Sequence, residues 1–318
     1  MKRFLILLSL TAALFTGRAA AQNDSLKALE AFAKGIEALQ TEKYDTTIFY
    51  MREALELIEG YQFGSDGGLI HYFIAESFRT LGNYDSAYVH LSAGREIMEA
   101  YNNIPGLAYF DKCEADIQNS LGNFIRSEEL YYIALKSLPV SDDPVTAAYI
   151  YTSLANIVLN RGENGSATEL FGQAEKYYRL ANYEPGLGDV YYGYGLIATN
   201  TNDNPLADSL FDVSLSIFTK YNLTLGIANA WYGKGIVAMN LGKNKLSIIA
   251  SSKALELYKQ VNYPMGIANT HTNIAMVSIN TADYENAEKN FNAALPWLEK
   301  INYLIGFGNV TTVSVSWR

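Results

Sequence analysis

The sequence predicts an all-α fold of stacked helical hairpins. Small residues recur every 40 residues in three columns, where a column is the set of residues at one equivalent position of successive repeats. Glycine marks most of the intervening turns, and proline is scarce, with 7 residues in 318. Repeats of this kind stack and bury a continuous core. We therefore expect a solenoid of seven hairpins over residues 22–303, followed by a partial eighth.

The three columns indicate where the two helices of each hairpin approach closely. Column 1 falls in the middle of each first helix, column 2 early in each second helix, and column 3 a turn and more later. Helices approach closely only where the side chains at their crossing are short, and a bulkier residue there costs roughly 1–3 kcal/mol. The members are Gly35, Ala75, Ala115, Ala155, Gly195, Gly235 and Ala275 in column 1; Thr47, Ala87, Ser127, Ala167, Ala207, Ser247 and Ala287 in column 2; and Ala54, Gly94, Ala134, Ala174, Ser214, Ala254 and Ala294 in column 3.

Residues 1–21 have the pattern of a signal peptide. Met-Lys-Arg gives a positive start, an apolar run follows, and Ala19 and Ala21 form a small-residue cleavage site before Gln22. The apolar run falls short of the ~20 residues that a membrane-spanning helix needs, and no cysteine follows the site for lipid attachment. We predict export to the periplasm, with no membrane span after cleavage. Asp24 or Ser25 should cap the first helix.

Glycine is expected to end most first helices, because it adopts the left-handed conformation of a helix terminus without strain. The position is held by Glu42, Gly82, Gly122, Gly162, Asn202, Gly242 and Ala282. Asparagine tolerates this conformation, but Glu42 and Ala282 should form turns that differ in detail. A further glycine column is expected to mark helix starts together with nearby proline. It comprises Gly106, Gly186, Gly226, Gly266 and Gly306, with Thr146 as the exception.

Residues 304–318 begin an eighth repeat without continuing its pattern. Val315 stands where a small residue is expected, and the final TTVSVSWR suits a strand better than a helix. A solenoid normally closes with a polar capping helix. Two interpretations stay open: a truncated end, or an end that packs on a partner, which would allow self-association.

Composition and charge exclude several classes of function. After removal of the signal, the chain has 21 basic and 33 acidic residues, a net charge of −12. A nucleic-acid-binding protein needs a cationic surface, so no nucleic-acid partner is expected. His71 and His271 would lie five repeats apart with no other ligand near, so no metal site is expected. Cys113 stands beside Glu114 and Asp116, which should raise the pKa of its thiol. We expect no cofactor and no catalytic residues.

The repeats resemble the tetratricopeptide repeat, whose signature is W-x2-L-G-x2-Y, then A-x3-F, then A. The residues that carry the resemblance are Tyr151, Leu154, Ala155, Gly162, Ala167, Phe171 and Ala174 in the fourth repeat; Trp231, Gly235, Gly242, Ser247 and Ala254 in the sixth; and Ile274, Ala275, Ala287, Phe291 and Ala294 in the seventh. The unit has 40 residues, against about 34 in the family. The resemblance implies a right-handed superhelix that acts as a non-enzymatic scaffold for protein–protein interaction.

The long unit, which often opens with Gly-Ile-Ala or Gly-Leu-Ala, is similar to the extracytoplasmic region of Bacteroidetes-type two-component sensor kinases and regulators. This similarity implies the sensor or assembly part of a bacterial signalling system. The sequence has no kinase motif and no nucleotide-binding glycine loop, so kinase activity is not carried over. A fragment of a sensor histidine kinase is an alternative.

In this family, residues of the first helices line the concave groove. Asparagines and tyrosines recur there at 40-residue spacing: Asn160, Asn200, Asn240 and Asn280 at one position, Tyr72, Tyr192 and Tyr232 at a second, and Tyr109 and Tyr149 at a third. Such a surface suits a protein or peptide segment, or alternatively a carbohydrate such as a peptidoglycan fragment. The competing interpretation is that the asparagines only close their helices and the tyrosines pack between repeats.

The most distinctive groove surface spans the sixth and seventh repeats. Its predicted residues are Asn229, Tyr232, Ile236, Met239 and Asn240, followed by Asn269, Thr272, Met276, Ile279 and Asn280. The family's clamp for a chaperone's terminal carboxylate would need free cationic side chains in the groove. Only Arg79 and Lys112 stand at suitable positions, and they lie beside Glu76 and Asp116. We therefore reject that specificity.

Overall fold

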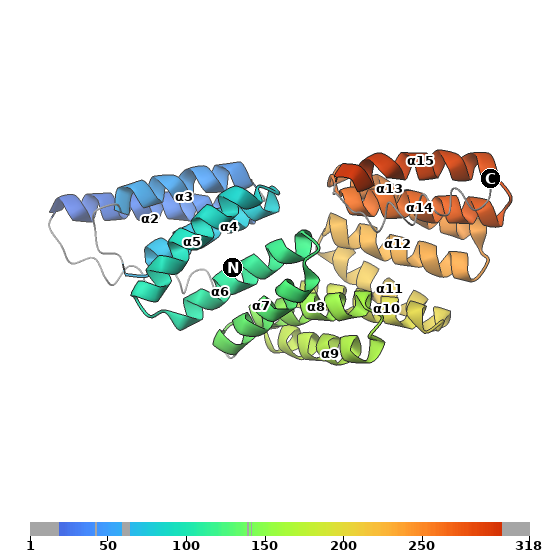
Figure 1. The fold of residues 1–318 in the computed structure, drawn as a ribbon, viewed down its shortest axis with the longest axis horizontal. Coiled ribbons are helices and arrows are strands. Elements are labelled where there is room, and N and C mark those ends of the chain that lie inside the picture. Colours follow the sequence, from blue (N-terminus) through green and yellow to red (C-terminus); the bar gives the residue numbers. More distant parts are fainter. Residues whose placement is uncertain (1–18, 42, 59–63, 139, 141, 301–318) are drawn as a thin grey trace. The chain divides into compact units, whose positions relative to one another are not determined.

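The computed structural model describes residues 19–41, 43–58, 64–138, 140 and 142–300, and within them the chain forms seven consecutive helical hairpins (Figure 1). The first helices are α2 (Ala19–Gln40), α4 (Asp66–Thr80), α6 (Ile104–Ser120), α8 (Pro144–Asn160), α10 (Glu184–Asn200), α12 (Thr224–Asn240) and α14 (Pro264–Asn280). The second helices are α3 (Tyr44–Ile58), α5 (Tyr84–Ala100), α7 (Phe124–Ser137), α9 (Asn164–Leu180), α11 (Asn204–Lys220), α13 (Asn244–Gln260) and α15 (Tyr284–Lys300). The predicted all-α solenoid is confirmed.

Some of the predictions concern the two ends of the chain. The partial eighth repeat of residues 304–318 lies outside the described residues, as does most of the predicted signal peptide. The prediction that Asp24 or Ser25 caps the first helix is wrong, because α2 already begins at Ala19 and runs through both residues. The alanines before Gln22 are strong helix formers, which explains the earlier start.

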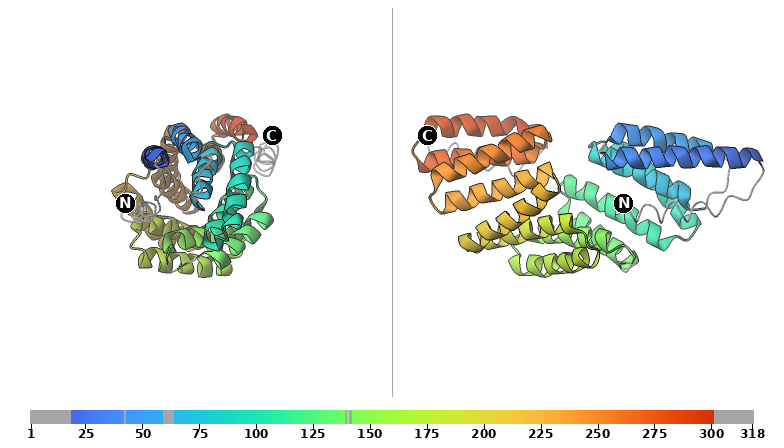
Figure 2. Two further views of the ribbon diagram at one scale, coloured as in Figure 1. Left: turned by 90° about the vertical axis from the view of Figure 1, so that its left-hand side faces the viewer. Right: turned by 180° about the vertical axis from the view of Figure 1, so that it is seen from behind.

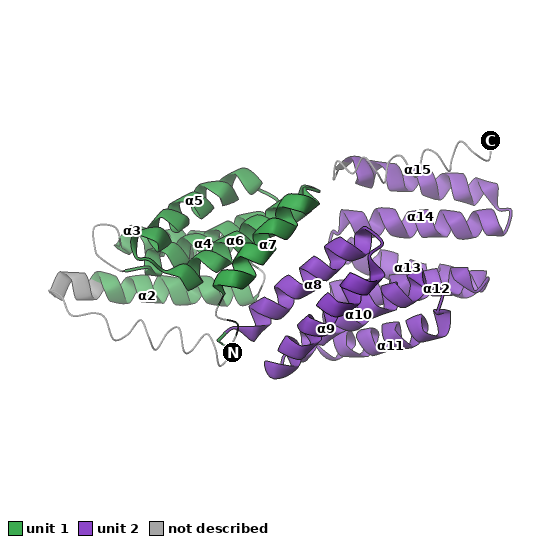
Figure 3. Cartoon of the chain, turned by 60° about the horizontal axis from the view of Figure 1, so that its bottom comes forward, with its two compact units in different colours: residues 1–142 green, residues 143–318 purple. Residues whose placement is uncertain are grey.

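The hairpins fall into two compact units, with the boundary between Asp142 and Asp143 (Figure 3). Helices α2–α7 belong to the first unit and α8–α15 to the second. Helix α7 ends at Ser137, and Leu138 has extended backbone angles, with φ −73° and ψ 129°. Pro139 follows, and proline disfavours the helical conformation of the residue before it. The helix therefore stops a turn earlier than its equivalents α9, α11, α13 and α15.

In the second unit, the first helices form a layer of their own. Each packs against the second helix of its hairpin, and each second helix also contacts the next first helix (Figure 2). In addition, α8, α10, α12 and α14 contact one another in succession, whereas successive second helices have no comparable contact within the described residues. Because the inner layer of a curved two-layer array is the more crowded, we identify the first helices as the inner layer.

The three small-residue columns lie where the sequence predicts, and every member is buried. A Cβ atom on Gly195 would stand 2.6 Å from the ring of Phe211, which lies on the partner helix. The serines of columns 2 and 3 have a second role that the sequence analysis missed. Ser247 Oγ donates to the carbonyl of Gly235 at 2.7 Å, and Ser127 Oγ donates to the carbonyl of Ala115 at 2.8 Å. The crossing is thus joined by hydrogen bonds as well as by close packing.

The turns inside the hairpins follow the prediction except at one position. The four glycines and Asn202 have positive φ, as expected. Ala282 also has a positive φ of 58°, so the prediction of a different turn is wrong there. Its N–H donates to the carbonyl of Ile279 at 2.9 Å, just as Gly242 donates to Met239. These bonds and the fixed packing of the flanking helices offset the roughly 1–2 kcal/mol cost of a left-handed alanine. Glu42 lies outside the described residues.

The connectors between repeats contain a column that the sequence analysis did not identify. Their left-handed residues are asparagines, the residue type that best tolerates positive φ after glycine. They are Asn102, Asn182, Asn222 and Asn262, with φ between 49° and 55°. Asparagine therefore provides the left-handed residue of the connectors between repeats, as glycine does in most of the turns inside the hairpins.

The glycine column at the repeat starts serves a different purpose from the predicted one. Gly226 and Gly266 are not among the residues with positive φ, so a special backbone angle does not explain them. A Cβ atom on Gly226 would stand 2.5 Å from the ring of Phe218, and one on Gly266 the same distance from the ring of Tyr258. The glycine is needed because an aromatic residue of the preceding helix lies directly on the backbone.

A substitution at this position tests that account. Gly226→Ala should lower the free energy of unfolding by about 1–3 kcal/mol, because the ring of Phe218 must move. Gly172→Ala is the matched control: Gly172 is exposed in the middle of α9, and the nearest atom to its added Cβ is 3.9 Å away. It should raise stability by up to ~1 kcal/mol through helix propensity. Urea unfolding of both variants measures the effects, and equal stabilisation would contradict the packing argument.

Candidate functional site

The inner layer of the second unit presents one helix face made of three rows of residues. Positions i, i+3 and i+7 share a helix face, and the rows take these positions on α8, α10, α12 and α14. We call this surface the inner face. Row A is Tyr149, Asp189, Asn229 and Asn269; row B is Thr152, Tyr192, Tyr232 and Thr272; and row C is Asn156, Leu196, Ile236 and Met276.

Asn229 is held in place by a tyrosine of the next helix. The Tyr258 hydroxyl, on α13, donates to Asn229 Oδ1 at 2.7 Å. Burial raises the pKa of Tyr258 well above its usual value, so the phenol stays protonated and remains a donor. Since the amide oxygen is occupied, the amide NH2 group keeps its two donors for another partner. Asn229 is therefore a fixed donor on a half-buried surface.

The tyrosines of row B combine packing with partial exposure. The Tyr192 ring lies tilted against Phe211 with centroids 5.6 Å apart, and Tyr232 packs on the core of its repeat. Desolvation raises the pKa of Tyr232 to about 12. Both side chains are half-buried, so part of each ring remains accessible. Part of each tyrosine therefore packs within the solenoid, as the alternative interpretation states. The rest of its surface is accessible to a partner.

Asp189 is the unusual member of row A. Its side chain is exposed, and it makes no hydrogen bond or ion pair with any described residue. Water reaches the carboxyl group, but the surrounding protein removes part of its hydration, and this desolvation raises its pKa to about 7. Burial raises the pKa values of Tyr178 and Tyr183, and the negative charge of Asp189 raises both further. The carboxyl therefore interacts electrostatically with two phenols and has no positive partner among the described residues.

The predicted asparagine series lies at the edge of this layer. Asn160, Asn200, Asn240 and Asn280 are the exposed last residues of α8, α10, α12 and α14. Asn200 Nδ2 donates to Asn164 Oδ1 at 3.2 Å, and Asn240 Nδ2 to Asn204 Oδ1 at 3.5 Å. Each bond joins the end of one first helix to the start of the preceding second helix. The amides of Asn200 and Asn240 thus join neighbouring hairpins, and the groove role of the series stays a prediction.

The other predicted site residues come together on the inner face. Asn229, Tyr232 and Ile236 follow one another along α12, and Met239 lies half-buried a turn beyond them. Asn269 and Met276 repeat the pattern on the neighbouring α14, which contacts α12. Sequence reasoning missed Asp189, although it shares the 40-residue register of Asn229 and Asn269. The register alone could have identified it.

In the first unit, the two cations at groove positions are neutralised by neighbouring acids. Lys112 Nζ lies 2.6 Å from Glu76 Oε1 and 2.8 Å from Asp116 Oδ2, and Arg79 Nε lies 2.6 Å from Glu76 Oε2. Burial would raise the pKa of Glu76, but Lys112 and Arg79 outweigh it and lower the value to about 2. These pairs support the rejection of a carboxylate clamp. Cys113 is fully buried, and its pKa is raised by burial and then by Glu76, so its thiol is unreactive.

The expectation that no potential ligand lies near His71 is wrong. His90, on α5, places its Nδ1 3.0 Å from Nδ1 of His71. Burial lowers both pKa values, that of His90 to about 4, so the rings are neutral at pH 7 and share one hydrogen bond. His271 makes the equivalent contact with Asn290 at 2.9 Å. His71 and its equivalent His271 therefore each make a polar contact with the second helix of their hairpin. The described residues contain no cluster of three or more potential metal ligands.

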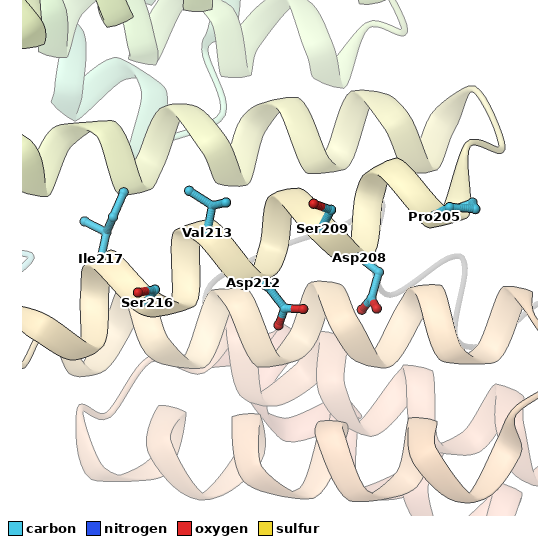
Figure 4. A pocket seen from close by; sticks show the side chains of 7 residues that line it. All are labelled: Pro205, Asp208, Ser209, Asp212, Val213, Ser216 and Ile217. Carbon is cyan, nitrogen blue, oxygen red and sulfur yellow. The ribbon is translucent and has the colours of Figure 1, made fainter.

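The second-helix layer also has a depression, but its charges are already paired. It is open, with a volume of about 560 Å³, and all of its lining residues belong to α11 (Figure 4). They are Pro205, Asp208, Ser209, Asp212, Val213, Ser216 and Ile217. Lys234 Nζ lies 2.6 Å from Asp208 and 2.7 Å from Asp212. The inner face, rather than this depression, therefore remains the candidate site.

Comparison with known families and structures agrees with this architecture. A family model described as tetratricopeptide repeat matches residues 228–261, which contain most of α12 and all of α13. The same unit recurs across the seven described hairpins. The chain is a tetratricopeptide-repeat protein. Curated protein sequences contain no significant match to this tetratricopeptide-repeat chain.

Several solved structures share the fold of this tetratricopeptide-repeat protein at low sequence identity. A Rap protein complexed with competence and sporulation factor has a TM-score of 0.71 and 12% identity, with 91% of this chain and 80% of that chain covered. The Rap conjugation gene regulator of plasmid pLS20, in complex with the Phr* peptide, has a TM-score of 0.69 and 12% identity, with coverage of 91% and 78%. A tetratricopeptide repeat protein from Parabacteroides merdae has a TM-score of 0.56 and 10% identity, with coverage of 91% and 98%. At this identity the likeness shows the fold alone.

The ionic cluster of the first unit makes a testable contribution to stability. Lys112→Met should lower the free energy of unfolding by about 3–5 kcal/mol, because it leaves buried carboxylates without their partner. Lys220→Met is the control, since Lys220 and Glu184 form a pair on the exposed surface and such pairs contribute little. Urea unfolding at pH 7 compares the two variants. A loss no larger than that of the control would contradict the proposed role of the cluster.

Asp189 should make stability depend on pH. Its pKa is raised in the folded state, so the folded protein binds more protons than the unfolded chain between about pH 4 and 7. Stability should therefore fall as pH rises through this window. Asp189→Asn should be more stable than the parent at pH 8 and should show a weaker decline. Thermal unfolding at several pH values measures this, with the exposed Glu169→Gln as control. An unchanged profile in Asp189→Asn would contradict the shift.

Proposed function

We propose that the chain is a non-enzymatic scaffold whose inner face binds an extended segment of a protein or peptide. The observation that carries this proposal is Asn229, whose amide is oriented by Tyr258 within a polar row that crosses four adjacent helices. A peptide backbone offers one donor and one acceptor per residue, and a fixed asparagine amide can bind it. The half-exposed tyrosines would add contact area at a small cost in conformational entropy.

The family and the fold support the same kind of function. The tetratricopeptide-repeat fold supports a protein-interaction scaffold. Two of the similar structures are described as complexes, one with competence and sporulation factor and one with the Phr* peptide. Ligands of that kind favour a peptide over a glycan for the present chain. The carbohydrate alternative, which rests on the same asparagines and tyrosines, becomes one outcome of the test below.

We also propose that the scaffold is exported and serves as the sensor or assembly part of a signalling system. The signal-like residues 1–21 and the similarity of the long repeat to extracytoplasmic sensor regions support this. None of the described helices combines the length and apolar character needed to cross a membrane. N-terminal sequencing of the chain from the periplasmic fraction should begin at Gln22. An uncut chain in the cytoplasmic fraction would contradict export.

Selection from a phage-displayed library of random dodecapeptides tests the binding proposal. Peptides should be enriched on the parent chain, and Asn269→Arg should weaken their binding at least tenfold, because it places a long cation across row A. Leu246→Arg is the matched control, because Leu246 belongs to none of the three rows and lies exposed on α13, in the second-helix layer. It should leave the affinity unchanged. No enrichment, or retention of muropeptides alone, would overturn the proposal.

A further inference from the structure

We infer that Asp189 is the subsite for a cationic nitrogen of the bound segment, either a lysine or arginine side chain or a free N-terminal ammonium group. This inference rests on the proposed function, since it concerns the chemistry of a segment bound along the inner face. Three independent features of the second unit support it: the missing donor beside Asp189, the charge balance of the inner layer, and the aromatic surroundings.

The repeat itself provides the comparison for the first feature. Asn229 receives its hydrogen bond from Tyr258, which is 29 residues further along the chain. The residue 29 positions after Asp189 is Phe218, whose ring packs on Gly188 and Gly226. Phenylalanine has no hydroxyl, so Asp189 lacks the donor that its equivalent has. This repeat thus has a carboxyl group without a described partner at the position where the next repeat has an amide that receives a hydrogen bond.

The second feature is the charge of the inner layer. Along α8, α10, α12 and α14, the charged residues are Glu184, Asp189 and Lys234. Glu184 is paired with Lys220 at 2.5 Å, and Lys234 with two aspartates of α11. Asp189 is therefore the one charge of these four helices that no described residue neutralises. A cation brought by a ligand would meet an attraction that the chain itself leaves uncompensated, whereas an anion would be repelled.

The third feature is the aromatic environment. The charge of Asp189 acts on Tyr178 and Tyr183, whose rings lie 5.8 Å apart between centroids. Tyr149, in the same row, is 38% exposed. Aromatic faces attract ammonium and guanidinium groups. A carboxylate beside aromatic rings at a solvent-accessible position combines the two kinds of group that recognise an organic cation.

A metal ion is a poorer occupant for this subsite. Calcium takes 6–8 oxygen ligands, usually several of them carboxylates, and the described part of the chain offers no cluster of acidic residues or histidines here. A single carboxylate cannot supply such a shell. An organic cation needs only one charged partner and apolar contact for its stem.

The peptides from the selection described above test this assignment. They should be enriched in lysine or arginine relative to the unselected library. For a selected peptide, Asp189→Asn should weaken binding at least tenfold, and replacing the peptide's basic residue by glutamine should do the same. The two changes together should cost no more than either alone, because they remove the same contact. Binding to the parent should also weaken between pH 8 and pH 5, and binding to Asp189→Asn should not.

The control and the outcomes separate this inference from the function on which it rests. Asp212→Asn, on the second-helix layer, should leave the affinity unchanged. Peptides that bind the inner face without a basic residue, or that bind Asp189→Asn as tightly as the parent, would overturn the cation subsite and leave the scaffold function standing. If no peptide is enriched on the parent chain, both proposals fall.

Discussion

The close approach of the two helices in each hairpin is the constraint on which the rest of the structure depends. At the crossing, only small residues fit, and Ser127 and Ser247 use their hydroxyls to join the helices through the opposite backbone. Because the small-residue columns fix this contact in every repeat, each first helix keeps one face that is only partly used in core packing. In the second unit, these faces adjoin one another and form the inner face. Binding chemistry can vary there without disturbing the hairpins.

Because the repeats share one framework, a difference between equivalent residues of two repeats can be explained physically. Asn229 and Asp189 occupy the same position of successive repeats, yet only Asn229 has a tyrosine hydroxyl to bind. The difference comes from the aromatic residue that packs on the connector glycine, Tyr258 in one repeat and Phe218 in the other. The aromatic residue that packs on the connector glycine thus determines whether the neighbouring row A side chain receives a hydrogen bond. The exchange leaves a negative charge on a surface whose other charges are paired within the chain.

Periodicity predicted most of the fold because packing imposes it: small side chains at the crossings and glycines at the turns are required in every repeat. It did not predict the turn at Ala282, where hydrogen bonds outweigh an unfavourable residue. The pairing of His71 with His90 depends on how two helices face each other, which spacing alone does not give. The series ending in Asn280 falls on the last residue of each first helix, a position that its 40-residue spacing alone does not give. Asp189 was passed over because its type differs from that of its equivalents.

The most direct test of the account is a crystal structure of the full chain bound to a selected peptide. The peptide should lie along α8, α10, α12 and α14, with Asn229 Nδ2 donating to one of its carbonyl oxygens. A lysine, arginine or terminal ammonium nitrogen should stand within hydrogen-bonding distance of the Asp189 carboxylate. A peptide seated instead on the second-helix layer, or one that crosses the inner face with no cation beside Asp189, would contradict the account.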